Sequence, residues 1–163
     1  MQKNPKKQKT DWSIDNRHKA TAAGCVFNLD GDKVLLVQDK DKNITFPKGY
    51  IDKKDEVDGF TNTTILCAKR EVKEETNVDF QLSTLVPTAY TESRGKYQKH
   101  VTVHIGIADE DNCHVHIQND KEENRLEWAK FVPINDARKC LEHCALTALE
   151  GAIVLHSAPT LRL

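Results

Sequence analysis

The chain has 163 residues, of which 38% are hydrophobic and 30% are charged, a size and composition typical of one globular domain with a single core. Its 24 lysines and arginines nearly balance its 25 aspartates and glutamates, which excludes a global field that would favour nucleic acid or a membrane surface. No apolar run approaches the roughly 20 residues of a membrane-spanning helix, and the first residues lack the apolar segment of a secretory signal.

Residues 1–19 are polar and basic, with Lys3, Lys6, Lys7 and Lys9 near the start, and we expect a partly flexible segment there. A single domain is expected from 20 to 163. The five cysteines are odd in number and scattered, which favours reduced thiols over disulfides. We therefore expect a cytoplasmic protein, with a nuclear location also open and without a membrane partner. Protein partners stay open.

The first elements of the chain are predicted to be strands. The run from Ala22 to Asn28 is followed by a glycine-bearing turn and then by Lys33 to Gln38, a pattern typical of two strands joined by a tight hairpin. Ile44 to Phe46 is predicted to be a short strand that Pro47 stops. The chain then enters a glycine loop at Gly49.

The principal helix is predicted from Thr63 to Thr76. Apolar or small side chains at Ile65, Cys67, Ala68 and Val72 are spaced for one helical face, while Arg70, Glu71, Glu74 and Glu75 crowd the other. Such a helix packs its apolar face on a sheet and exposes a cluster of charge.

The second half of the chain is predicted to complete the sheet. Phe80 to Thr91 is expected to be extended, and His100 to Ala108 alternates apolar with polar residues as a half-buried strand does. Glu92 to Lys99 is predicted to be a long hairpin loop. Short strands are expected at His114 to Ile117 and Glu127 to Val132, and a helix is expected from Pro133 toward Val154.

The glutamates of the principal helix are the first candidates for chemistry. Glu74 and Glu75 follow Glu71 by three and four residues, so the carboxylates project within about 6 Å of one another and repel. Only the pair Arg70 and Glu74, four residues apart, offers an opposite-charge contact within the helix. Because Mg²⁺ prefers oxygen ligands, the cluster predicts a divalent cation site, although a solvated acidic helix face is the alternative for the glutamates alone.

The flanking motifs decide between these two interpretations. Phe46-Pro47-Lys48-Gly49, followed by Arg70-Glu71-Val72-Lys73-Glu74-Glu75-Thr76-Asn77-Val78, resembles the Nudix box, G-x5-E-x7-R-E-U-x-E-E-x-G-U with U aliphatic. The resemblance implies an α/β fold, an α/β/α sandwich around a mixed β-sheet, and hydrolysis of a diphosphate. It also implies that Glu71, Glu74 and Glu75 bind Mg²⁺ (or Mn²⁺), with the Gly49 carbonyl as a further candidate ligand and Arg70 as an internal salt-bridge organiser of the catalytic helix.

Two positions depart from the box. About seven extra residues separate Gly49 from Arg70, so the first box glutamate aligns loosely with Asp55 or Glu56, and the partner of Arg70 is left open. Asn77 replaces the terminal glycine, a mild change because asparagine tolerates the positive φ expected at a helix end. The base that accepts the proton of the attacking water is also open, between a box glutamate and a loop residue such as Glu92, Glu122 or Glu123.

Substrate preference depends on residues outside the box. A highly anionic small-molecule polyphosphate would suit a convergence of basic side chains at Arg17, His18, Lys19, Lys48, Arg94, Lys96, Lys99 and His100. The chain resembles the hydrolases of diphosphoinositol polyphosphates and diadenosine polyphosphates in its size and in the basic segment before a strand. It also shares Phe46-Pro47-Lys48-Gly49 and Cys67-Ala68-Lys69-Arg70-Glu71-Val72 with mRNA decapping enzymes, which would make RNA a partner.

Two further functions stay open. One is the hydrolysis of free nucleoside triphosphates, for which the basic segments would be incidental. The other is a catalytically silent Nudix-fold module that binds a nucleotide, RNA or protein. The intact carboxylates at Glu71, Glu74 and Glu75 favour an enzyme, because a binding module gains nothing obvious from uncompensated acidic side chains.

Overall fold

The computed structural model describes residues 18–117 and 126–158. The strands are β1 (His18–Phe27), β2 (Lys33–Asp39), β3 (Ile44–Thr45), β4 (Lys48–Tyr50), β5 (Gln81–Leu82), β6 (Thr88–Arg94), β7 (Tyr97–Ile107) and β8 (Leu126–Pro133). The α-helices are α1 (Phe60–Thr76), α2 (Ile134–Cys140) and α3 (His143–Ser157), and η1 (Lys53–Asp55) and η2 (Glu110–Asn112) are short 3₁₀ turns. None of the helices in these ranges is both long and apolar enough to cross a membrane.

The strands form one mixed sheet. Its longest pairing is parallel and joins β1 to β7 from His18 opposite Gln98 to Phe27 opposite Ile107. The other pairings are antiparallel, with β2 and β4 on β1, β3 and β8 on β2, and β5 and β6 on β7. The two long central strands therefore hold in place the strands next to the site, with β4 on β1 and β6 on β7.

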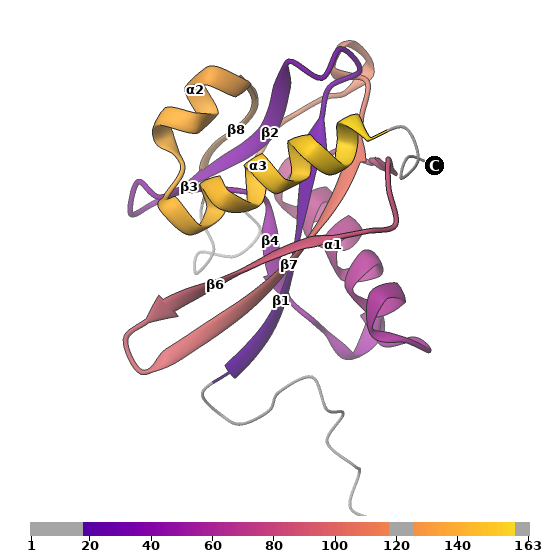
Figure 1. Cartoon of the computed structure of the whole chain (residues 1–163), viewed down its shortest axis with the longest axis vertical. Coiled ribbons are helices and arrows are strands. Elements are labelled where there is room, and N and C mark those ends of the chain that lie inside the picture. The colour runs from indigo at the N-terminus through magenta and orange to yellow at the C-terminus, as the bar shows by residue number, and fades with distance from the viewer. Residues whose placement is uncertain (1–17, 118–125, 159–163) are drawn as a thin grey trace, which may run out of the picture.

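Helices cover both faces of this sheet (Figure 1). On one face, Val101 and Val103 of β7 pack in the same buried cluster as Leu149 and Ala152 of α3. On the other face, Ala22 of β1 belongs to a second cluster with residues of α1 such as Val72. Alternate residues of each strand thus face opposite layers, and the predicted α/β/α sandwich around a mixed sheet is confirmed.

Several predicted boundaries were wrong, chiefly around turns. The predicted loop from Glu92 to Lys99 is strand almost throughout, because β6 and β7 continue until Arg94 pairs with Tyr97. The connection is a two-residue turn whose first residue, Gly95, has a φ of +59°, as a type II′ hairpin turn requires. Polar composition was misleading here because both strands of the arm extend beyond α3, where polar side chains reach solvent (Figure 1).

The segment from His114 to Ile117 is not a strand. Its backbone instead meets the end of α1, where the His116 N–H donates to the Thr76 carbonyl at 3.2 Å and the Asn77 side chain donates to the His114 carbonyl at 3.0 Å. The residues alternate as they do in a strand, but the segment packs against the end of α1 and, among the described residues, has no strand beside it to pair with.

The predicted C-terminal helix is two helices. Leu141 leaves the helical conformation with a ψ of 142° and is buried, and α3 begins at His143. The helical pattern continues across the break because Leu141 and both helices contribute to the same core cluster. The spacing of apolar residues alone does not show that the chain changes direction between α2 and α3.

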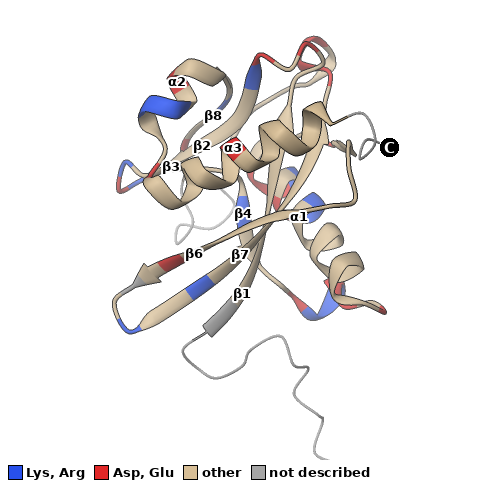
Figure 2. Cartoon of the chain, in the orientation of Figure 1, with Lys and Arg blue, Asp and Glu red and all other residues tan. Residues whose placement is uncertain are grey.

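Positive and negative residues are interspersed over the molecule (Figure 2), as the balanced composition predicts. Figure 2 also shows basic residues on the β7 side and at the tip of the β6–β7 arm, with an acidic residue on the β6 side. The arm is therefore mixed in charge rather than uniformly basic.

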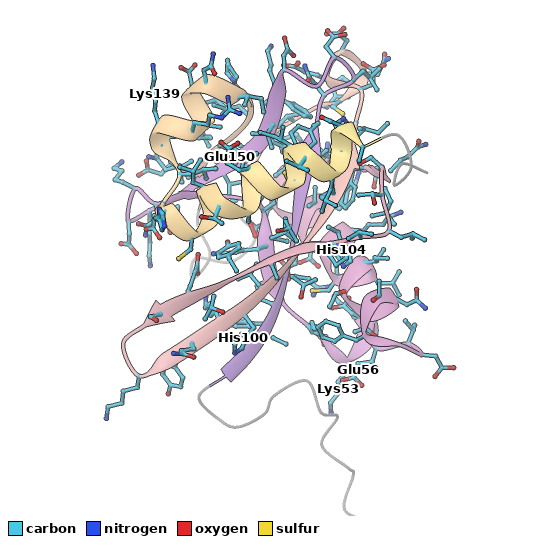
Figure 3. All side chains as sticks on the ribbon, viewed as in Figure 1. Lys53, Glu56, His100, His104, Lys139 and Glu150 are labelled. Carbon is cyan, nitrogen blue, oxygen red and sulfur yellow. The ribbon has the colours of Figure 1, made fainter. Side chains whose placement is uncertain are left out.

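His104 of β7 is fully buried between the sheet and α1 (Figure 3). Its Nε2 lies 2.7 Å from Thr64 Oγ1, and its Nδ1 has no hydrogen-bond partner in the described residues. Burial lowers the pKa of this imidazole to about 4, so the ring is neutral in the folded protein at neutral pH.

Because the pKa of His104 is lower in the folded than in the unfolded state, its contribution to stability is complete above about pH 6.5 and is lost as the pH falls toward 4. We expect the His104 contribution to the free energy of unfolding, measured with a chemical denaturant as the difference between wild type and His104→Gln, to be about 2 kcal/mol smaller at pH 5 than at pH 7. The corresponding difference between wild type and exposed His143→Gln should not change with pH. An equal pH dependence in all three proteins would contradict the assignment.

Candidate active site

The two halves of the box meet where β4 lies against α1. The Lys48 N–H donates to Glu75 Oε1 at 3.2 Å, and the Cys67 thiol lies 3.6 Å from the Gly49 carbonyl oxygen. A Cβ on Gly49 would lie 2.1 Å from the Glu71 carboxyl carbon. Glycine is therefore required here for close approach of a side chain, and the predicted glycine loop is the short strand β4, in which Gly49 pairs with Ala22.

Arg70 is held by Asp55 in a bidentate ion pair. Arg70 Nε and Nη2 donate to the two carboxylate oxygens of Asp55, each at 2.8 Å, and Nη1 donates to Glu71 at 2.8 Å and to Glu74 at 3.0 Å. Asp55 is only 3% exposed. Burial alone would raise the pKa of Asp55, but hydrogen bonds from Arg70 and the Asp52 N–H outweigh it and hold that pKa below its usual value.

This contact identifies the residue at the first box glutamate. Asp55 stands at the G-x5-E spacing from Gly49 and is buried against Arg70, whereas Glu56 is exposed. Counting strictly from Gly49 would have found Asp55 in the sequence. The extra residues therefore follow Asp55, and they leave the partner of Arg70 in place.

The insertion is accommodated by a longer α1. The helix begins at Phe60, earlier than the predicted Thr63, after Gly59 at a φ of +89°. The Thr63 hydroxyl fastens the preceding loop by accepting from the Val57 N–H and donating to its carbonyl, each at 3.1 Å. The residues between Asp55 and Arg70 are therefore divided between this loop and the first turns of α1.

The carboxylates of α1 are only partly neutralised, by Arg70 beside Glu71 and Glu74 and by Lys54 3.7 Å from Glu74. Burial and the nearby charge of Glu71 raise the pKa of Glu75 to about 8, and burial raises the pKa of Glu71 despite the contact with Arg70. In the described ranges, no three acidic, histidine or cysteine side chains already converge as a metal cage, since Glu71 and Glu74 turn to Arg70 while Glu75 turns to β4. Their hard oxygen donors, and the raised pKa values of Glu71 and Glu75, nevertheless fit a divalent cation.

The end of α1 has the predicted geometry. Asn77 adopts a φ of +63° in the left-handed region, and its N–H donates to the Lys73 carbonyl at 2.9 Å. The side chain of Asn77 also reaches the His114 carbonyl at 3.0 Å. The position shapes the helix end and points away from the carboxylates.

The predicted convergence of basic residues is incomplete. Lys99 and His100 are neighbours on β7 and therefore face opposite sides of the sheet: Lys99 lies over the Tyr50 ring, while His100 contacts Thr91. Lys96 lies in the hairpin turn. Only Lys48 and Lys99, of the predicted residues whose side chains are described, share a face.

The remaining predicted residues are described in part or not at all. Arg17 lies outside the described residues, as do Glu122 and Glu123. His18 and Lys19 form the start of β1 and Arg94 ends β6. A role of these residues in binding substrate stays a prediction.

A comparison with protein-family models matches residues 18–149 to the Nudix domain. The chain belongs to the Nudix family. It is a hydrolase of that family, and Nudix hydrolases generally use divalent metal ions. A comparison with curated protein sequences found no match.

Solved Nudix structures share the fold. A Caenorhabditis elegans Ap4A hydrolase in a binary complex superposes with a TM-score of 0.61 at 19% identity, over 85% of this chain and 93% of that one. The Escherichia coli dihydroneopterin triphosphate pyrophosphohydrolase gives a TM-score of 0.61 at 15% identity, over 84% and 97% of the two chains. The Nudix domain of Shewanella oneidensis NrtR, complexed with ADP ribose, gives 0.59 at 17% identity, over 85% and 86%.

Asp55→Asn is expected to lower the free energy of unfolding by about 3 kcal/mol, because it removes one partner of a largely buried ion pair and leaves Arg70 undercompensated. Denaturant unfolding at neutral pH measures the change. Glu56→Gln is the matched control, since it neutralises the exposed neighbouring carboxylate and should change stability by less than about 0.5 kcal/mol. Equal effects of the two substitutions would contradict the assignment of Asp55.

Asn77→Gly is expected to leave activity within about twofold of the wild type, because glycine adopts the same left-handed backbone at a helix end. The steady-state rate with a hydrolysed diphosphate substrate measures this. A loss of tenfold or more, in a variant that unfolds at the wild-type temperature, would place Asn77 in contact with substrate or metal.

Proposed function

We propose that this Nudix hydrolase cleaves the diphosphate linkage of a dinucleoside polyphosphate or a diphosphoinositol polyphosphate by attack of an activated water. The observation that supports the proposal is the acidic edge of α1 against β4, with Glu71 packed on Gly49, Glu75 bonded to the Lys48 N–H, and Arg70 anchored by Asp55. A carboxylate cluster that is costly in an apo protein gains its stability by holding a cation.

Glu71, Glu74 and Glu75 are the residues that would hold Mg²⁺ or Mn²⁺, with the Gly49 carbonyl as a further ligand. When bound, such a cation neutralises phosphate oxygens, aligns the diphosphate and lowers the pKa of a bound water. The role of Arg70 is positional, because its guanidinium is directed to Asp55, Glu71 and Glu74. No nucleophile from the protein is required.

The proton of the attacking water is assigned to a box carboxylate. Of the described candidates, Glu92 already bonds the Lys48 ammonium at 2.6 Å and lies on the α3 face of the sheet. Glu75 lies at the acidic edge of α1, beside the carboxylates that would hold the cation and its bound water. We therefore favour Glu75 over Glu92 for this role.

The substrate class is proposed on two grounds. The fold matches that of an Ap4A hydrolase over nearly the whole of both chains, and the sequence resembles the diphosphoinositol and diadenosine polyphosphate hydrolases in size and in its basic segment. Capped RNA and nucleoside triphosphates are the alternative substrates. A panel of these four compound classes, incubated with Mg²⁺ or Mn²⁺ and resolved by mass spectrometry, distinguishes them by their products.

Glu75→Gln is expected to reduce turnover by at least on the order of 100-fold, because it removes a group that stabilises charge in the reacting complex. Product release under saturating metal measures the change. Glu150→Gln is a matched control on α3, where Glu150 pairs with Arg138 at 2.7 Å away from the box (Figure 3), and it should keep full activity. Near-normal turnover in folded Glu75→Gln would contradict the assignment of Glu75 as a metal ligand. If folded wild type hydrolyses none of the compounds, a binding module would be favoured instead.

A further inference from the structure

A second charged group lies beside the box on the opposite face of β4. Lys48 and Gly49 are consecutive in the strand, so Gly49 faces α1 while the Lys48 side chain crosses the α3 face of the sheet. Tyr90 and Glu92 of β6 project from the same face, since Tyr90 pairs with Val101 of the α3 cluster and Glu92 follows two residues later. Figure 1 shows that β1, β6 and β7 continue past α3 in this region.

Lys48 and Glu92 form a short, shielded ion pair. Lys48 Nζ lies 2.6 Å from Glu92 Oε1, and the two side chains are 11% and 9% exposed. The Tyr90 hydroxyl lies 3.5 Å from the same ammonium, and the Tyr90 ring centroid lies 5.8 Å from it. Since the backbone N–H of Lys48 bonds Glu75, the ammonium lies within one side-chain length of the carboxylate edge, and its charge is directed to Glu92.

A second lysine of this face, Lys99, also has a partner. Lys99 Nζ lies 4.9 Å from the centroid of the Tyr50 ring, which is itself 44% exposed. Tyr50 directly follows Gly49 in β4. The face next to the box therefore offers an accessible aromatic ring and two cations that are each engaged within the protein.

We propose that Glu92 is a specificity residue of this site: by pairing with Lys48 it weakens binding of densely charged polyanions, and so favours dinucleoside polyphosphates over diphosphoinositol polyphosphates. This inference rests on the proposed function and selects between its two substrate classes.

The preference follows from competition for one ammonium. A phosphate that binds Lys48 must displace Glu92 or approach its negative charge, and this cost grows with the number of phosphates close to the pair. An inositol that carries phosphates around its ring concentrates charge in one place and needs converging cations. A dinucleoside polyphosphate carries fewer charges in a line, and its bases can contact an exposed aromatic ring such as Tyr50.

Binding of inositol hexakisphosphate to metal-free protein tests this without catalysis. Isothermal titration calorimetry is expected to show binding to Glu92→Gln on the order of tenfold tighter than to wild type, as one additional charge-assisted contact becomes available. Lys48→Met should bind more weakly than wild type, and Lys48→Met/Glu92→Gln should lie near wild type. Glu110→Gln is the matched control, because Glu110 pairs with Lys33 at 3.1 Å at the far end of β1 and changes the net charge equally.

Affinity in Glu92→Gln that is unchanged, or raised only as much as in Glu110→Gln, would overturn the proposal. If Glu92→Gln does not fold, the comparison of Lys48→Met with the double variant decides: tighter binding by the double variant supports the role of Glu92, and equal binding overturns it. Thermal unfolding of each protein identifies the folded variants.

The hydrolysis assay separates this inference from the proposed function. In Glu92→Gln, the ratio of kcat/KM for a diphosphoinositol polyphosphate to kcat/KM for a dinucleoside polyphosphate should rise on the order of tenfold, mainly through KM. A change confined to kcat, equal for both substrates, would make Glu92 part of the chemistry and overturn the specificity role. If wild type hydrolyses neither compound, the proposed function fails, while the calorimetric series still tests the charge competition.

Discussion

The ion pair between Arg70 and Asp55 is the contact on which the site depends. It joins the middle of α1 to the end of the segment that leaves β4, so it fixes α1 against the strand that contains Gly49. The same guanidinium also bonds Glu71 and Glu74. One arginine therefore positions the helix and partly neutralises its acidic face, which lets three carboxylates lie close together before any cation binds.

The insertion shows how this constraint tolerates a change in chain length. Extra residues between Asp55 and Arg70 could have displaced the two partners. They instead form a loop closed by the Thr63 hydroxyl and the first turns of α1. The ion pair is kept because this loop and helix bring Asp55 and Arg70 together.

The strand β4 relates the chemistry to the substrate. Its alternation directs Gly49 to Glu71 on one face and Lys48 to Glu92 on the other. Hydrolysis and substrate preference would then be controlled by neighbouring residues of a single three-residue strand. Glu71 can approach Gly49 closely because glycine has no side chain. Lys48 instead reaches Glu92 through its long, charged side chain.

The family, the sandwich fold, the clustered carboxylates of α1 and the left-handed helix end at Asn77 could all be predicted from the sequence alone. These features are local, because helical spacing and a short motif contain the physical information that specifies them. Other features became visible only in the folded structure: the pairing of Asp55 with Arg70, the pairing of Glu92 with Lys48, and the location of Lys99 and His100 on opposite faces of the sheet. The same holds for the packing of the segment after His114 on a helix end and for the turn of the chain at Leu141. Each of these depends on which segments distant in sequence become neighbours, and on strand register, which a pattern along one chain does not specify.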